Sequence, residues 1–156
     1  MGKDDIVFLP SREKVIETIK KFQTDSTLQW IFFAYQEADP STKLNKGNSN
    51  SVELAKTGNE PLDKNQLETL RDVTKNDESI TSYLSPFSAN YFIARIDANR
   101  YIFINWIGSK TKTLQKTRVM THRLELKSLA EKLLSMSFVF DHNGIDEFEK
   151  LVRLVD

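Results

Sequence analysis

The chain contains no cysteine, little glycine and no long hydrophobic run, and each absence argues against a class of protein. Without cysteine there is neither a disulfide framework nor a thiolate metal site. The five glycines form neither a GxGxxG nor a P-loop sequence, so nucleotide binding by backbone amides is not expected. The longest apolar run is far below the roughly 20 residues that cross a bilayer. The charged opening sequence MGKDDIVFLP is unlike a signal peptide, so we expect a soluble, cytoplasmic protein.

Signatures of catalysis and metal binding are also missing. Cysteine is absent and no GxSxG sequence is present, so no nucleophile stands in a known catalytic pattern. The two histidines, His122 and His142, lie in different expected elements, and we expect both at the surface or its boundary. Asp141–Gly144 resembles a calcium loop, but Val139 and Lys150 stand where carboxylates are required. We predict a turn there, and a protein that is not an enzyme and has no cofactor or metal ion.

Four segments have the apolar periodicity of amphipathic helices. The first follows Ser11, a residue type that commonly caps helices, and the second follows Asp63, which can form a capping box with Gln66. In chain order, the expected buried faces are Val15, Ile16, Ile19 and Phe22; Leu67, Leu70 and Val73; Leu126, Leu129, Ala130 and Leu133; and Ile145, Phe148, Leu151 or Val152, and Val155.

Five short apolar segments are expected to be strands: Leu28–Tyr35, Ser51–Thr57, Tyr91–Ile96, Tyr101–Ile107 and Ser137–Phe140. The first, third and fourth are apolar at successive positions, so both of their faces should be covered, with Trp30 and Trp106 buried. The short connection Asp97–Arg100 favours an antiparallel hairpin. We therefore predict a single domain over residues 1–156, of the α/β (α+β) class. It would be a three-layer sandwich, with a central mixed sheet between helices and long polar loops at 37–50 and 74–90.

The chain has a formal net charge of zero, but one stretch of it carries basic residues and no acidic ones. Between Asp97 and Glu125 there is no carboxylate, while six residues are basic: Arg100, Lys110, Lys112, Lys116, Arg118 and Arg123. Leu114, Val119 and Met120 are interleaved with these cations, and we expect Arg123 on an exposed flank of the third helix. This mixture favours an interface with apolar anchors and a basic rim. A solvated helix face explains the charge alone equally well.

Three sequences in the chain resemble the actin-depolymerising-factor homology (ADF-H) family, and most closely its coactosin-like branch. LQWIFFAYQ is similar to the family's second strand, and IFINWIG to the strand that ends in Trp-Ile-Gly. TLQKTRVMTHRLELKSL resembles the start of the family's long third helix. The resemblance covers nearly the whole chain and implies the ADF-H, gelsolin-like fold.

The resemblance implies actin binding without catalysis, through the long third helix and the loop before it. The family's actin-binding positions fall on Lys112, Lys116, Arg118 and Arg123, with Val119 and Met120 as candidate apolar contacts and Arg100 as the basic residue that opens the Trp-Ile-Gly strand. Arginine stands at this last position, where lysine is usual in coactosins.

Departures from the family pattern bear on the mode of binding. The first serine is Ser11, an expected helix cap, whereas cofilin-type members carry a regulatory serine at the extreme N-terminus. The acidic residues Asp146, Glu147 and Glu149 suit severing poorly. We therefore expect a monomer associated with the cytoskeleton that binds filamentous actin, without a nucleic-acid partner. Two alternatives remain open: binding of phosphoinositides or an anionic membrane by the same basic face, and cofilin-type monomer binding with depolymerisation.

Overall fold

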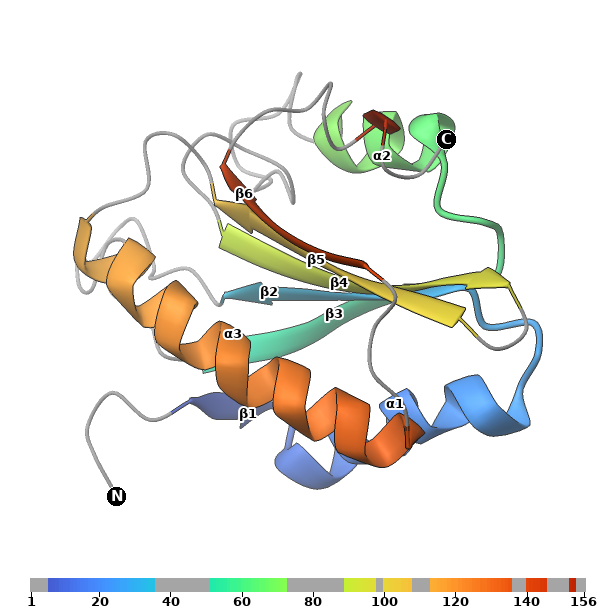
Figure 1. The fold of residues 1–156 in the computed structure, drawn as a ribbon, viewed down its shortest axis with the longest axis horizontal. Coiled ribbons are helices and arrows are strands. Elements are labelled where there is room, and N and C mark those ends of the chain that lie inside the picture. Colours follow the sequence, from blue (N-terminus) through green and yellow to red (C-terminus); the bar gives the residue numbers. More distant parts are fainter. Residues whose placement is uncertain are drawn as a thin grey trace.

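A six-stranded mixed sheet forms the centre of the molecule (Figure 1). The computed structural model describes residues 6–35, 51–72, 89–97, 100–107, 113–135, 140–145 and 152–153. The strands are β1 (Val7–Leu9), β2 (Trp30–Tyr35), β3 (Ser51–Gly58), β4 (Ala89–Asp97), β5 (Arg100–Ile107) and β6 (Phe140–Ile145), in the order β1-β3-β2-β4-β5-β6. The four central strands, β3, β2, β4 and β5, are antiparallel to one another, whereas the edge strand β1 is parallel to β3 and the edge strand β6 is parallel to β5.

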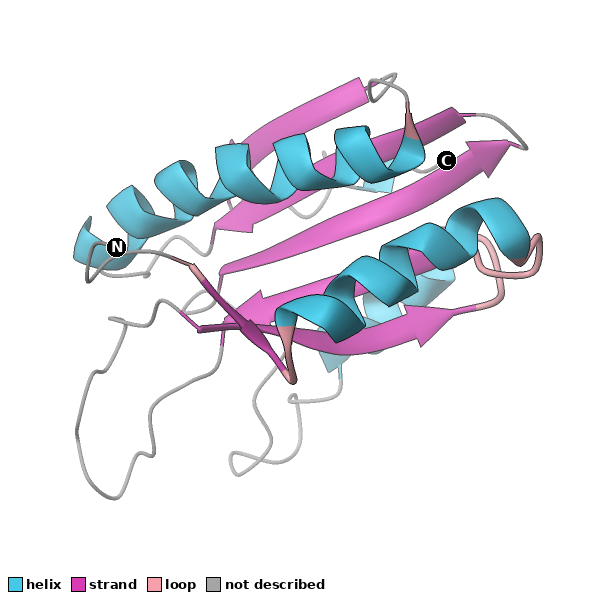
Figure 2. Ribbon diagram, turned by 90° about the horizontal axis from the view of Figure 1, so that it is seen from below, coloured by secondary structure: helices cyan, strands magenta, loops and turns pink. Residues whose placement is uncertain are grey.

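Helices cover both faces of the sheet. Helices α1 (Arg12–Thr24) and α3 (Thr113–Leu134) lie side by side on one face, and α2 (Lys64–Asp72) lies on the other (Figures 1 and 2). One apolar cluster joins α1 and α3 to the sheet, and a second joins the opposite face of the sheet to Leu62, Leu67 and Val152. The predicted three-layer sandwich with a central mixed sheet is therefore confirmed. No helix among the described residues is long and apolar enough to cross a membrane.

The two expected helix starts are found where the side chains predict them. The Ser11 hydroxyl accepts a hydrogen bond from the Lys14 amide at 3.1 Å, and α1 begins at the next residue. The Asp63 carboxylate accepts one from the Gln66 amide at 3.0 Å. The capping box is only half formed, however, because the Gln66 side chain donates to Glu60 at 2.9 Å.

The central strands are buried on both faces, as their continuous apolar sequence predicts. In β2 every residue but Ala34 is buried, and in β5 every residue after Arg100 is buried. Trp30 and Trp106 are 2% and 3% exposed, as expected. Gly58 of β3 lies opposite Trp30, and a Cβ at Gly58 would stand 2.1 Å from the indole ring. Glycine at this position therefore makes room for the tryptophan.

The two edges of the sheet differ from the sequence prediction. Strand β1 was not predicted, because a three-residue strand shows no periodicity. The prediction of a strand at Ser137–Phe140 is wrong in extent, since β6 runs from Phe140 to Ile145, and residues 137–139 lie outside the described part. The predicted turn at Asp141–Gly144 is also wrong, because these residues pair in parallel with β5. Main-chain hydrogen bonds to an edge strand do not require apolar side chains, so polarity misled the prediction.

The predicted final helix, Ile145–Val155, is only partly within the described residues. Ile145 belongs to β6, so no helix begins there. Residues 152–153 are helical, and Val152 packs against the same cluster as Leu67. The other residues of the predicted helix lie outside the described part. The same is true of the side chains of His142 and Leu70, of Val73, and of the expected loop 37–50. The expected loop 74–90 also lies outside the described part except for residues 89–90, which belong to β4 and are not a loop.

Candidate functional site

Helix α3 carries most of the predicted site and has an unusual distribution of polarity. Its buried residues are Gln115, Val119, His122, Arg123, Leu126, Ala130 and Leu134. Three of these are polar, yet Leu114, Met120 and Leu124 of the same helix are 52%, 38% and 61% exposed. A surface helix normally does the reverse, burying its apolar residues and exposing its polar ones. Two features of the N-terminal half of α3 therefore require an explanation: its polar groups are buried, and several of its apolar side chains are exposed.

A hydrogen-bond chain beneath α3 accounts for the burial of His122. The Tyr35 hydroxyl lies 2.8 Å from the Tyr91 hydroxyl and 2.8 Å from His122 Nδ1. The Tyr91 hydroxyl donates to the Val119 carbonyl oxygen at 2.8 Å. Tyr91 has a single proton and gives it to Val119, so Tyr35 must donate to Tyr91 and accept from His122. All three bonds form together only when His122 Nδ1 carries a proton.

This chain ties α3 to strands β2 and β4. The Tyr35 and His122 rings are also stacked, with their centroids 5.8 Å apart. Burial raises the pKa of both Tyr35 and Tyr91 above that of a free tyrosine, because an ionised phenol would lose its hydration there. Both phenols therefore stay protonated at neutral pH and can act as donors. The expectation that His122 lies at the surface is wrong, since it is 1% exposed.

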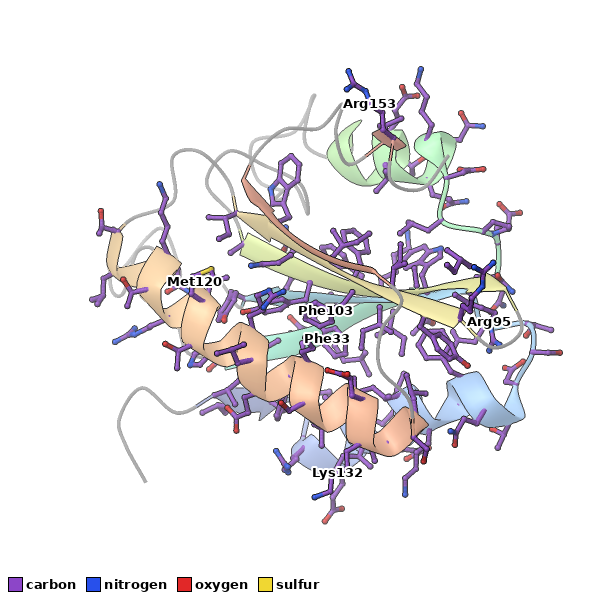
Figure 3. All side chains as sticks on the ribbon, viewed as in Figure 1. Phe33, Arg95, Phe103, Met120, Lys132 and Arg153 are labelled. Atoms are coloured by element: carbon purple, nitrogen blue, oxygen red, sulfur yellow. The ribbon has the colours of Figure 1, made fainter. Side chains whose placement is uncertain are left out.

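Two residues expected on the surface of α3 face the sheet instead. Val119 is fully buried, and Arg123 is 7% exposed with its guanidinium 5.8 Å from the centre of the Phe103 ring. Figure 3 shows Phe103 on the sheet beside α3. The physical reason is the helical repeat: Val119 and Arg123 precede Leu126 by seven and three residues, so they continue its buried stripe. Extending that stripe backwards from Leu126 would have predicted both burials.

The exposed side of α3 presents apolar residues between cations. We define the α3 face as Leu114, Lys116, Arg118, Met120 and Leu124. At about 100° per residue, Leu124 lies near the middle, while Lys116 and Arg118 lie on opposite flanks. Both cations are partly buried, as expected for flanking positions. Figure 3 shows Met120 in the N-terminal half of the helix and Lys132 near its other end. Leu124 was not among the predicted site residues.

The structure separates Arg100 from the rest of the predicted site. Arg100 is exposed at the first residue of β5, paired with Asp97 across the hairpin. Helix α3 begins beyond the opposite end of β5, and an eight-residue strand spans about 25 Å. Lys116, Arg118 and Met120 are therefore close together, whereas Arg100 belongs to a second location. Lys112 lies outside the described residues. Within the described part, no group of three His, Cys, Asp or Glu side chains could hold a metal ion.

Comparison with known proteins identifies the family. Residues 8–150 match the family described as cofilin/tropomyosin-type actin-binding protein, and the chain belongs to that family. A search of curated proteins gives no significant match.

Similar solved structures support the fold assignment. Human coactosin-like protein is 13% identical, with a TM-score of 0.57 over 94% of this chain and 90% of that one. Cofilin from Streptomyces griseoflavus is 13% identical, with a TM-score of 0.60 over 96% and 92%. Coactosin from Entamoeba histolytica is 13% identical, with a TM-score of 0.50 over 97% and 95%. At these identities the likeness shows the ADF-H fold and no more.

Proposed function

We propose that this protein binds the side of actin filaments through the α3 face and modulates filament dynamics without strong severing, as a coactosin-like, cytoskeletal protein. Membership of an actin-binding family supports actin as the partner. The sequence resemblance to coactosins, and the structural likeness to two of them, support the branch.

The observation that carries the proposal is the exposed apolar row on α3. Met120 and Leu124 are four residues apart and therefore adjacent on the helix surface, and Leu124 is 61% exposed. Folding would gain more if α3 buried this leucine and exposed its arginine and histidine. The exposed leucine therefore does not serve the stability of the fold. A protein partner that covers the row would gain the apolar burial that folding leaves unused. Lys116 and Arg118 on its flanks would orient an acidic partner such as actin.

The separate position of Arg100 supports filament binding over monomer binding. The α3 face and Arg100 lie at opposite ends of β5, so one small patch on a partner would not reach both. A filament places neighbouring subunits side by side and can offer both contacts at once. Lys112, from the loop before α3, is retained in the proposed interface because of the family resemblance alone.

Co-sedimentation with filamentous actin at low and moderate salt tests the proposal, with monomeric actin titrated in parallel. We expect pelleting with filaments, weak monomer binding, and loss of pelleting in the double variant Lys116→Ala/Arg118→Ala. Lys132→Ala is the matched control, because it removes an exposed cation from the far end of the same helix. Arg100→Ala tests the second contact by itself.

Each other outcome has a defined meaning. Tight monomer binding would replace the filament proposal with cofilin-type monomer binding. Unchanged pelleting of a folded Lys116→Ala/Arg118→Ala variant would remove the interface from α3. Absence of binding to either form would overturn the actin proposal, and anionic vesicles would then be tested, since their binding should fall steeply with salt.

A further inference from the structure

A groove between α1 and β3, with no lining residue from α3, has features of a second binding site. It encloses about 420 Å³ between α1 and β3. Its walls carry Lys14 and Lys21 from α1 and Lys56 from β3, over an apolar floor that includes Leu28 and Leu54. A volume of this size falls in the ordinary range for ligand sites. No lining residue belongs to α3, and β2 separates β3 from β4 in the sheet.

The charge of the groove favours an anionic partner. Three lysines line it against a single carboxylate, that of Asp25. The Asp25 carboxylate accepts hydrogen bonds from the Thr27 amide at 2.9 Å and the Thr27 hydroxyl at 2.5 Å. These bonds lower the pKa of Asp25 and hold the carboxylate on its own turn. The lysines therefore outnumber the acids three to one in the lining, and Lys14 also pairs with Glu17, outside the lining, at 3.7 Å on the exposed side of α1.

The main chain of β3 gives the groove a second kind of binding group. Strand β1 pairs with β3 only from Ser51 to Glu53, so beyond Glu53 no described strand pairs with β3 on that side. Alternate N–H and C=O groups of an edge strand point away from its one neighbour, and they form a template for a further strand. The groove lies along this part of β3, since its lining runs from Leu54 to Thr57.

The spacing of the cations indicates an elongated ligand. Lys14 and Lys21 are seven residues apart on α1, which places them about 10 Å apart along the helix axis. Lys56 stands on the opposite wall. Flexible lysine side chains would have to converge to contact one phosphate group, whereas three to four residues of extended chain cover about 10 Å and would contact the lysines where they stand. Lys56 on the strand itself also disfavours pairing with a second copy of β3, because like charges would meet.

We propose that this groove binds an acidic protein segment in extended conformation, which adds to the edge of β3 in line with β1. Main-chain hydrogen bonds to β3 would supply pairing, and Lys14, Lys21 and Lys56 would select acidic side chains. The groove shares no residue with the α3 face, so the proposed actin-binding residues are not used by the acidic partner.

Fluorescence anisotropy with a labelled hexapeptide of alternating valine and glutamate tests the proposal. We expect the double variant Lys21→Glu/Lys56→Glu to bind about tenfold more weakly, since two favourable charge pairs become repulsive. Lys20→Glu is the matched control: it is an exposed lysine on the same helix outside the groove, and its effect should stay below about twofold. Circular dichroism establishes that each variant is folded.

Two further measurements test the strand geometry and the class of partner. Amide hydrogen exchange at residues 54–57 should slow when the peptide binds, and a peptide N-methylated at alternate residues should bind more weakly. Unchanged exchange, equal binding of the N-methylated peptide, or unchanged affinity of Lys21→Glu/Lys56→Glu would each overturn the proposal. Binding to phosphatidylserine vesicles or to inositol hexakisphosphate, with no binding of the peptide, would overturn it as well. The groove variants should still pellet with filaments, so failure here is distinguishable from failure of the actin proposal.

Discussion

Replacing Leu124 with alanine separates a binding residue from a folding residue on the same helix. Leu124 is 61% exposed, whereas Leu126, two positions later, is fully buried. Alanine is the strongest helix former, so the substitution removes side-chain surface without weakening α3. If Leu124 contacts actin, its loss should therefore appear in filament affinity and not in folding stability.

The expected size of the effect follows from the exposed fraction of the side chain. Full burial of a leucine contributes about 1.5–3 kcal/mol. Since 61% of Leu124 is available to a partner, the loss in binding should be about 1–2 kcal/mol, or about five- to thirtyfold in affinity. The free energy of unfolding should change by less than about 0.5 kcal/mol. Leu126→Ala should instead lower it by about 2–5 kcal/mol, because it opens a cavity in the core.

Filament co-sedimentation curves and urea denaturation of the same preparations measure both quantities. Val7→Ala is the matched control for binding, because Val7 is also exposed (45%) but lies in β1, away from α3. It should pellet like the unmodified protein. Equal filament affinity of Leu124→Ala and the unmodified protein would refute the role of the apolar row. A loss of stability above about 2 kcal/mol would refute the placement of Leu124 on the surface.

Three further predictions concern the fold that holds this face. Gly58→Ala should lower the free energy of unfolding by about 1–3 kcal/mol, because its Cβ would stand 2.1 Å from the Trp30 ring; an unchanged urea midpoint would contradict that packing. The raised folded-state pKa values of Tyr35 and Tyr91 mean that their stabilising effect is fully present below about pH 10 and is lost as pH rises, at up to about 1.4 kcal/mol per pH unit for each tyrosine. Urea denaturation across this range should show a shallower alkaline loss for Tyr35→Phe, and identical slopes would argue against burial of the phenol. Ser11→Ala should lower the free energy of unfolding by about 1 kcal/mol, because α1 loses its cap. Ser11→Thr should retain most of that stabilisation, and thermal denaturation of both variants measures the difference.

Local sequence determined the elements whose causes are local. Ser11 and Asp63 mark the starts of α1 and α2, because a side-chain oxygen two or three residues from an unpaired amide can cap it in any context. Continuous apolar sequence identified β2 and β5 as strands covered on both sides, and from these the three layers follow. Main-chain pairing at the edges was not accessible in this way, since β1 and β6 depend on partners about 40 residues away along the chain.

In the candidate site, too, some features were predicted from local sequence and others depend on tertiary contacts. The sequence located Lys116, Arg118 and Met120 on α3 and predicted an apolar stripe from Leu126, but not that the polar residues His122 and Arg123 share its buried side. That side is decided by Tyr35, Tyr91 and Phe103, which lie on three strands and offer polar and aromatic partners to His122 and Arg123. Burying those two polar side chains is favourable only where the sheet provides such partners. The sheet therefore determines the rotation of α3 about its own axis. The amino-acid sequence alone thus determined that α3 is a basic, amphipathic helix, while the tertiary structure decided that Leu124 faces outward and Arg123 inward.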